Sequence, residues 1–380
     1  MKKILLAGLF IPVLFSCKKS SDGPDGPTPP PPTQNDIAAI DNSVQTFMNN
    51  YSIPGVSIAV TKNGKLVYVK SYGKMSASDN TPIKNNSLFR IASVSKPVTA
   101  VGIMKLVEAN LLTLDSKVFG PGSILGSTFP SAPAGTHDIT VRHLLHHTTN
   151  AWPNNGTDPM FQQPGMSHTQ LINWTLANYN ASVTRGIYRY SNFGYCLLGR
   201  IIEKLSGKSY EQFIKDEVLT PSGVTKMTLG GNTLADRKTD EVIYTGQGGF
   251  DPYAYQVTRM DAHGGWIASA TDLAKFMVRV DGFPSKPDIL QPSTITLMTT
   301  PSVPSSNYAS GWGVNANNNW WHTGGIPGTA TEIIRSAGGF NWVVLCNSRS
   351  VSAGFDTALD NLLWPAISNA NTPWQDIDQF

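Results

Sequence analysis

The chain has 380 residues, of which 40% are hydrophobic and 14% are charged. This composition is that of a globular protein large enough for one sizeable domain or two lobes, and it excludes a chain that is disordered throughout. The formal net charge is only +3 and no long basic run is present, so the sequence gives no reason to expect nucleic acid as a partner.

Residues 1–16 have the features of a secretory signal, because two lysines precede an apolar run that is too short to span a bilayer. The signal ends in Leu-Phe-Ser before Cys17, which resembles a bacterial lipobox. That resemblance implies that Cys17 becomes a lipidated N-terminal residue; a plain signal peptide with an incidental cysteine is the alternative. Several acyl chains would hold the protein on a membrane of the bacterial cell envelope, at the periplasmic face or the cell surface.

Residues 17–36 form a segment rich in Ser, Asp, Gly and Pro, with four consecutive prolines at 29–32. Such a segment buries no apolar surface, so we expect a semi-extended tether between the lipidated cysteine and the rest of the protein. We place the globular domain at residues 37–370.

The domain is predicted to begin with a helix over residues 37–51, where the apolar residues have helical spacing. Two strands follow, at residues 56–60 and 66–72, on either side of Lys-Asn-Gly-Lys. An Asn-Gly pair accepts the positive φ angles of a tight turn, so these strands are expected to form a hairpin.

Residues 89–97 read Phe-Arg-Ile-Ala-Ser-Val-Ser-Lys-Pro, and a helical pattern follows to about residue 110. Ser93 and Lys96 therefore lie on one face of a helix, about one turn apart. A lysine whose pKa is lowered can take the proton of a serine hydroxyl, and the amides of a helix N-terminus can stabilise an oxyanion. A capping serine followed by a surface lysine is the structural alternative.

Histidines at positions 143, 146 and 147 could share a metal ion if they lay on a helix. No His-Glu-x-x-His motif is present and no acidic ligand is obvious beside these histidines, so we expect no metal but a helix packed near the site. Residues 170–179, 195–205 and 209–218 also have helical patterns. Residues 111–260 are therefore predicted to form a mostly helical lobe.

Further helices are predicted at residues 272–280 and 292–298. Three strands are then predicted at residues 311–314, 329–336 and 341–346, followed by an apolar helix at 355–367. Strands at both chain ends around a helical middle predict an α+β fold, with one antiparallel sheet built from both termini and flanked by helices. Cys196 and Cys346 are expected to be buried free thiols, with a single bridge between them as the alternative.

Two further motifs accompany the serine and the lysine. Residues 188–195 read Tyr-Arg-Tyr-Ser-Asn-Phe-Gly-Tyr, and residues 321–325 read Trp-His-Thr-Gly-Gly. With residues 93–96 they resemble, in order, the S-x-x-K, Y-x-N and [KH]-T-G motifs of the penicillin-recognising serine hydrolases. That family includes class C β-lactamases, D-alanyl-D-alanine carboxypeptidases and related esterases. His-Gly-Gly at 263–265 competes for the third motif but lacks the hydroxyl residue.

The resemblance implies a β-lactamase/transpeptidase-like fold and a role for each motif residue. Ser93 would be acylated, while Lys96 and Tyr190 exchange the proton. Asn192 would hydrogen-bond the amide of the substrate. The backbone N–H groups of Ser93 and Gly325 would form the oxyanion hole.

His322, Thr323 and Gly324 belong to the third motif, where the first two would hold the carboxylate or carbonyl end of the substrate. His322 stands where class C β-lactamases carry lysine. Because an imidazole with a pKa of about 6.5 is mostly neutral at pH 7, it attracts a carboxylate less than an ammonium does, which disfavours efficient β-lactam hydrolysis.

The function expected from the sequence is a serine hydrolase that acts through an acyl-enzyme on D-Ala-type peptides or related amides and esters, without a cofactor. A carboxylesterase or a class C-type β-lactamase would use the same residues. A protein that binds cell-wall peptides without turnover is the third possibility. No G-x-S-x-G elbow is present, which argues against an α/β-hydrolase.

Overall fold

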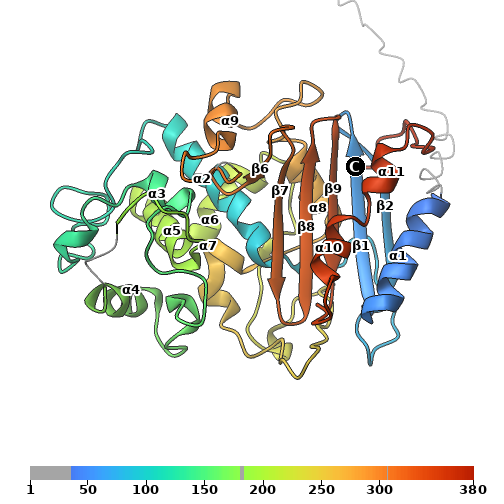
Figure 1. The fold of residues 1–380 in the computed structure, drawn as a ribbon, viewed down its shortest axis with the longest axis horizontal. Coiled ribbons are helices and arrows are strands. Elements are labelled where there is room, and N and C mark those ends of the chain that lie inside the picture. Colours follow the sequence, from blue (N-terminus) through green and yellow to red (C-terminus); the bar gives the residue numbers. More distant parts are fainter. Residues whose placement is uncertain (1–35, 180–183, 306) are drawn as a thin grey trace, which may run out of the picture. The chain divides into compact units, whose positions relative to one another are not determined.

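Figure 1 shows the protein as a computed structural model, which describes residues 36–179, 184–305 and 307–380. The signal at residues 1–16, Cys17 and all but the last residue of the tether lie outside the described residues. The predictions for this N-terminal part therefore stay predictions. Within the described residues, no helix has both the length and the apolar character needed to cross a membrane.

A six-stranded antiparallel sheet is built from both ends of the chain, in the order β2-β1-β9-β8-β7-β6. Its strands are β1 (Gly55–Lys62), β2 (Lys65–Gly73), β6 (Gly313–Val314), β7 (Trp320–Ile326), β8 (Thr329–Ser336) and β9 (Phe340–Cys346). The pairing of β1 with β9 joins the N-terminal hairpin to the C-terminal strands. The predicted sheet from both termini is confirmed.

The predicted hairpin is also confirmed, since Asn63 and Gly64 connect β1 to β2 with φ angles of 50° and 75°. Positive φ at both central residues is the conformation for which an Asn-Gly pair is favoured. The turn chemistry thus sets the register of the two strands.

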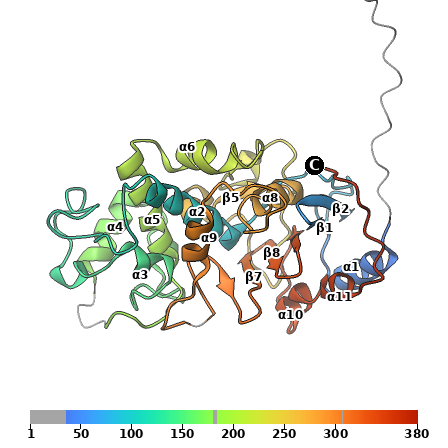
Figure 2. The same ribbon diagram turned by 90° about the horizontal axis from the view of Figure 1, so that it is seen from above.

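Helices cover both faces of the sheet, as Figures 1 and 2 show. Helices α1 (Ala38–Tyr51), α10 (Phe355–Asp360) and α11 (Trp364–Ser368) pack on one face, and α8 (Ala270–Met277) packs on the other. Successive side chains of a strand point to opposite faces, so the neighbours Val344 and Leu345 belong to different cores. This two-sided burial explains why β9 is buried at every position.

The helical lobe lies beside β7 and β6, at the left of Figure 1. The helices beyond the sheet are α2 (Ser95–Glu108), α3 (Val141–Leu145), α4 (His168–Ala177), α5 (Asn192–Ser206), α6 (Tyr210–Ile214), α7 (Asp261–Gly264) and α9 (Pro292–Thr299). A second, three-stranded sheet of order β3-β5-β4 joins Phe89–Arg90, Trp266–Ala268 and Thr228–Leu229. These strands are too short for a periodic pattern, so the sequence did not predict them.

Two local predictions differ from the structure. The single helix expected at residues 355–367 is divided into α10 and α11. Pro365 lies in the first turn of α11, where its missing N–H is tolerated, whereas inside a continuous helix it would remove a hydrogen bond. The Trp-His-Thr-Gly-Gly motif lies within β7, where no strand was predicted. Glycine is depleted in strands, so the two glycines weaken the sequence signal of this one.

Cys196 and Cys346 are both buried and free, which confirms that they do not pair.

Leu345→Ala tests the two-sided burial of the sheet. Leu345 is fully buried in a central strand, and we expect the variant to lower the free energy of unfolding by about 2–5 kcal/mol. The matched control is Leu234→Ala, because Leu234 is 50% exposed. In this variant the free energy of unfolding should fall by no more than about 0.5 kcal/mol. Urea unfolding at equilibrium measures both, and equal losses would contradict the described packing.

Candidate active site

Ser93 lies in a 3₁₀ turn, η1 (Ala92–Val94), between β3 and the first residue of α2. Its side chain is partly exposed, whereas its two neighbours are buried. Ala92 has a φ of 45°, a left-handed conformation that is rare outside glycine and is found at functional sites. The turn therefore presents the hydroxyl at the start of a buried helix, where the sequence predicts it.

Lys96 is fully buried directly behind this hydroxyl. Its Nζ lies 3.0 Å from Oγ of Ser93, 2.7 Å from Oδ1 of Asn192 and 3.0 Å from the carbonyl oxygen of His263. Burial holds the pKa of Lys96 well below its ordinary value, and the Asp158 carboxylate opposes that shift. The alternative of a surface lysine is therefore wrong, and the pair has the contact that activation of a serine requires.

Tyr190 completes the group around the serine. Its ring centroid lies 4.7 Å from Nζ of Lys96, and its side chain forms a hydrogen bond with Ser93. Burial raises the pKa of Tyr190 well above its ordinary value, so the phenol stays protonated at neutral pH. The structure thus brings together the three residues predicted to be catalytic.

Asn192 links the lysine to a buried carboxyl group. Its Oδ1 accepts the hydrogen bond from Lys96, while its Nδ2 donates to Oδ1 of Asn154 at 3.1 Å and to Oδ2 of Asp158 at 2.9 Å. Both ends of the amide are therefore engaged by the protein. The predicted contact between Asn192 and the substrate amide stays a prediction.

Asp158 is the member of this network that sequence reasoning missed. It is fully buried, and this burial raises the pKa of its carboxyl group from 3.8 to about 6, against the opposing effect of hydrogen bonds from Met160 and Asn192. It follows a polar Asn-Asn-Gly-Thr stretch that reads as an exposed loop. Only the tertiary structure brings this carboxyl to the lysine.

The third motif passes directly against the nucleophile on β7. A Cβ atom at Gly324 would lie 3.1 Å from the backbone nitrogen of Ser93 and would overlap the carbonyl oxygen of Ile91, so the close approach requires glycine. Gly325 lines the same cavity as Ser93, and the side chain of Thr323 is exposed. This placement fits the predicted oxyanion hole, which stays a prediction.

His322 is buried and engaged at both ring nitrogens. Its Nδ1 lies 2.6 Å from the carbonyl oxygen of Thr323, and its Nε2 lies 3.2 Å from the hydroxyl of Tyr308. That hydroxyl also contacts Nε2 of His147, whose Nδ1 accepts from the backbone N–H of Ser191.

The pattern of these hydrogen bonds assigns the protons. Since Nδ1 of His147 accepts, its Nε2 carries the proton and donates to Tyr308. The Tyr308 hydroxyl then donates to Nε2 of His322, whose Nδ1–H donates to Thr323. Burial lowers the pKa of His322 to about 3, so the ring is neutral. Its predicted contact with the substrate carboxylate stays a prediction, and the ring's two nitrogens are occupied within the protein.

The other histidines give no metal site. Among the described residues, no group of three or more His, Cys, Asp and Glu side chains is placed to hold a metal ion. His147 packs against Tyr190, with ring centroids 4.2 Å apart, as expected for a helix end near the site. His263, whose His-Gly-Gly sequence was set aside as the third motif, lines a cavity beside Ser93, and its buried Nε2 has no hydrogen-bond partner among the described residues.

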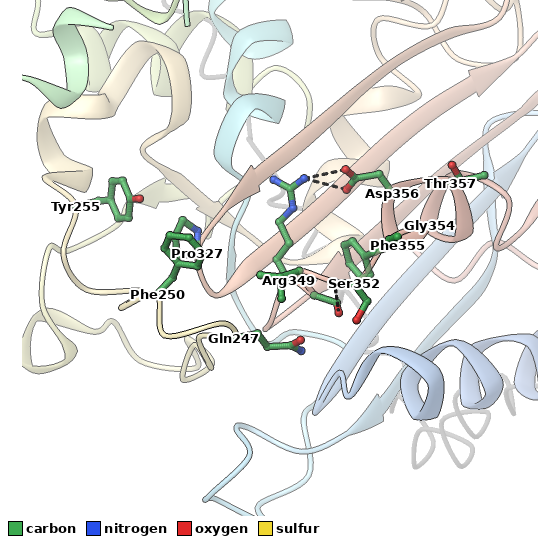
Figure 3. Close-up of a pocket in the computed structure, with 13 residues that line it drawn as sticks. Gln247, Phe250, Tyr255, Pro327, Arg349, Ser352, Gly354, Phe355, Asp356 and Thr357 are labelled. Atoms are coloured by element: carbon green, nitrogen blue, oxygen red, sulfur yellow. Dashed lines mark hydrogen bonds and ion pairs between the residues drawn. The ribbon is translucent and has the colours of Figure 1, made fainter. Parts of the chain in front are cut away.

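The cavity beside Ser93 has a volume of about 350 Å³, and Asn192, His263 and Gly325 also line it. A chamber of about 620 Å³ adjoins it and shares Tyr255, Pro327 and Arg349 with it, as Figure 3 shows for the chamber side. Both volumes suit small-molecule ligands.

The sequence of this chain is similar to those of known proteins. The family model described as beta-lactamase matches residues 40–363. Penicillin-binding protein 4* of Bacillus subtilis is 31% identical over 218 residues, covering 56% of this chain and 46% of that protein. The chain spans less than two thirds of the length of the first curated relatives that it matches.

Solved structures share the fold. A class C beta-lactamase superposes with a TM-score of 0.71 at 21% identity, covering 86% of this chain and 95% of that one. The D-amino acid amidase from Ochrobactrum anthropi SV3 superposes with a TM-score of 0.69 at 22% identity, covering 87% and 99%. The predicted fold is therefore confirmed.

Asp158→Asn tests the link between the buried carboxyl and the lysine. The Asp158 carboxylate raises the pKa of Lys96, so its removal lowers that pKa further. A base with a lower pKa is unprotonated at a lower pH, and we expect the acid limb of kcat/KM to move to lower pH. Ester hydrolysis between pH 4 and 9 measures this shift.

Asp158→Glu is the control, since it keeps the charge and should keep the wild-type limb. Lys96 also faces His147, His263 and His322, and burial lowers the pKa of each of these rings, which favours their neutral forms. An unchanged acid limb in a folded Asp158→Asn variant would contradict the link.

Proposed function

The chain belongs to the β-lactamase family, and from this membership we propose that it is a serine hydrolase that works through an acyl-enzyme on Ser93. The observation that carries the proposal is the 3.0 Å contact between the buried Lys96 amine and the Ser93 hydroxyl. The carbonyl oxygen of His263 and the amide of Asn192 hold the amine in place, so little reorganisation precedes the proton transfer.

In the proposed first step, the neutral amine of Lys96 takes the proton of Ser93 and Oγ attacks the carbonyl carbon of the substrate. The carbonyl oxygen gains the negative charge and accepts hydrogen bonds from the N–H groups of Ser93 and Gly325. When the tetrahedral species collapses, Tyr190 gives its proton to the departing group and recovers one from Lys96. Proton transfers of this kind contribute about 10²- to 10⁴-fold.

In the second step, a water molecule attacks the acyl carbonyl while the same amine takes its proton. The bond between Oγ and the acyl carbon breaks, and Ser93 regains its proton as the acid product leaves. Tyr190 is suited to pass protons because its raised pKa keeps it a phenol. No cofactor takes part in either step.

D-Ala-type peptides and related amides or esters are the substrates that we propose. Two kinds of support exist: one relative carries the name of a penicillin-binding protein, and a structural neighbour is a D-amino acid amidase. The neutral His322 stands where class C β-lactamases carry a lysine, and this difference from their third motif supports the choice over a class C-type β-lactamase. A carboxylesterase remains the alternative that the same residues support.

The test is labelling of the detergent-solubilised full chain with a fluorescent penicillin, together with hydrolysis of a p-nitrophenyl ester. We expect a covalent adduct and ester hydrolysis that both depend on Ser93, with hydrolysis reduced at least about 10³-fold in Ser93→Ala. Ser285→Ala, at an exposed serine, is the control and should behave as wild type.

The outcomes separate the possible activities. A long-lived adduct indicates a penicillin-binding peptidase, whereas a short-lived adduct with drug consumption indicates a β-lactamase. Ester hydrolysis through Ser93 without an adduct indicates an esterase. No Ser93-dependent turnover of either compound would overturn the proposal and favour a binding protein.

We also propose that Cys17 anchors the protein in the bacterial cell envelope through lipid. The support is the lipobox-like sequence before it and the proline-rich tether after it. In bacteria that process lipoproteins, the wild-type chain should enter the detergent phase of a phase separation, and Cys17→Ser should stay in the aqueous phase. Equal partition of the two proteins would contradict the anchor.

A further inference from the structure

Residues 153–166 form a loop before α4, and the short 3₁₀ turn η3 (Pro159–Phe161) is its regular element. Most residues of the loop are exposed, but Asp158 is fully buried and accepts a hydrogen bond from Asn192 at 2.9 Å. Because the Asp158 carboxylate raises the pKa of Lys96, the position of this loop affects the amine that the proposed reaction uses as a base.

The side chain of Arg259 binds this loop from the segment before α7. Its Nη1 donates to the carbonyl oxygens of Gln163 and Met166, at 2.7 and 3.0 Å. Its Nη2 donates to those of Met160 and Gln162, at 2.9 and 3.2 Å. Each Nη atom has two hydrogens, so all four are used. A guanidinium is suited to this task because its donors point in fixed directions within one plane.

The guanidinium of Arg259 is buried, with 8% of the residue exposed, and its partners are carbonyl oxygens. The carboxylate nearest to it in the sequence, that of Asp261, pairs with Arg200 at 2.6 Å. A carbonyl oxygen carries only a partial charge, so several are needed to replace the water that a buried cation loses. The cation and the loop therefore depend on each other: if they separate, Arg259 loses four acceptors and the loop loses four donors.

The segment that carries Arg259 is itself fixed near the site. Nε2 of His168 donates to the carbonyl oxygen of Arg259 at 2.8 Å. Four residues after Arg259, the carbonyl oxygen of His263 accepts the hydrogen bond from Lys96 at 3.0 Å. Arg259 thus joins two segments that both act on this lysine, one through the carbonyl of His263 and the other through Asp158.

We propose that Arg259 is a positioning residue, which holds the loop by its carbonyl oxygens and so keeps the Asp158 carboxyl group against Asn192 and near Lys96. Arg259 is not among the residues that line the cavity beside Ser93, so it acts through Asp158 and not on the substrate. The inference rests on the proposed function in one respect, since the amine that it serves is the proposed base.

Hydrogen exchange of the detergent-solubilised full chain tests the hold on the loop without turnover. In Arg259→Met we expect the amides of residues 158–166 to exchange at least about tenfold faster than in wild type, because a segment that loses several contacts opens more often. Peptides from β1 and β9 should keep their rates. Arg335→Met is the matched control and should leave the loop amides unchanged, since Arg335 is also buried but donates to the carbonyl oxygens of Asp281 and Asn318.

Hydrolysis of a p-nitrophenyl ester tests whether Arg259 acts through Asp158. Arg259→Met alone should lower kcat/KM at least about tenfold, since a small displacement of a group in the site costs this much or more. In a chain that already carries Asp158→Ala, the same substitution should lower kcat/KM at most about threefold, because the effects of two residues that act through one contact do not add. Arg259→Lys keeps the charge but has a single nitrogen, so its kcat/KM should lie between wild type and Arg259→Met.

The two measurements distinguish this inference from the proposed function. If the wild-type chain does not hydrolyse the ester, the proposed function fails, and the exchange rates alone decide whether Arg259 holds the loop. The positioning role is overturned if the loop amides of Arg259→Met exchange as in wild type, or if the fall in kcat/KM is the same with and without Asp158. Thermal unfolding establishes that each variant is folded, and Arg259→Lys replaces Arg259→Met in both measurements if the latter does not fold.

Discussion

The burial of the Lys96 amine beside a partly exposed serine is the constraint on which the site depends. An ammonium ion loses most of its hydration when it is buried, and this cost lowers the pKa of Lys96, so more of its amine is neutral and able to accept a proton. The surroundings offset only part of the cost, through the amide of Asn192, one carbonyl oxygen and the distant carboxyl of Asp158. A fuller compensation would stabilise the cation and raise its pKa, which would leave less of the neutral amine that the proposed reaction needs.

The six-stranded sheet supports the site around Ser93 and Lys96 from one side. Because β1 pairs with β9, the two ends of the chain form one layer that is buried on both faces, and β7 is held against the turn that carries Ser93. Gly324 permits that approach, and Gly325 makes room for Arg349. The two adjacent glycines thus avoid different steric clashes: a side chain at the first would meet the turn that carries Ser93, and a side chain at the second would meet Arg349.

The charged side chain that lines the cavity is not the histidine of the third motif. The ordinary pKa of a histidine is about 6.5, but burial lowers the pKa of His322 to about 3. The ring is therefore neutral, with its nitrogens in contact with Tyr308 and the carbonyl oxygen of Thr323. Among the described residues that line the cavity, Arg349 is the one lysine or arginine. It follows β9 and donates hydrogen bonds to Asp356.

The sequence by itself determined the elements whose signals are local: the hairpin at Asn63 and Gly64, the helix after Ser93, the strands at both ends of the chain and the order of the three motifs. The tertiary structure decided which residues surround those motifs. Asp158 is linked to Lys96 by Asn192, which lies 34 residues after Asp158 in the sequence. The guanidinium of Arg349 lies against Gly325, although the two residues belong to different segments of the chain. Periodicity and turn chemistry act over a few residues, whereas burial and electrostatic contacts depend on which segments the fold brings together, so neither residue had a signal in its own neighbourhood.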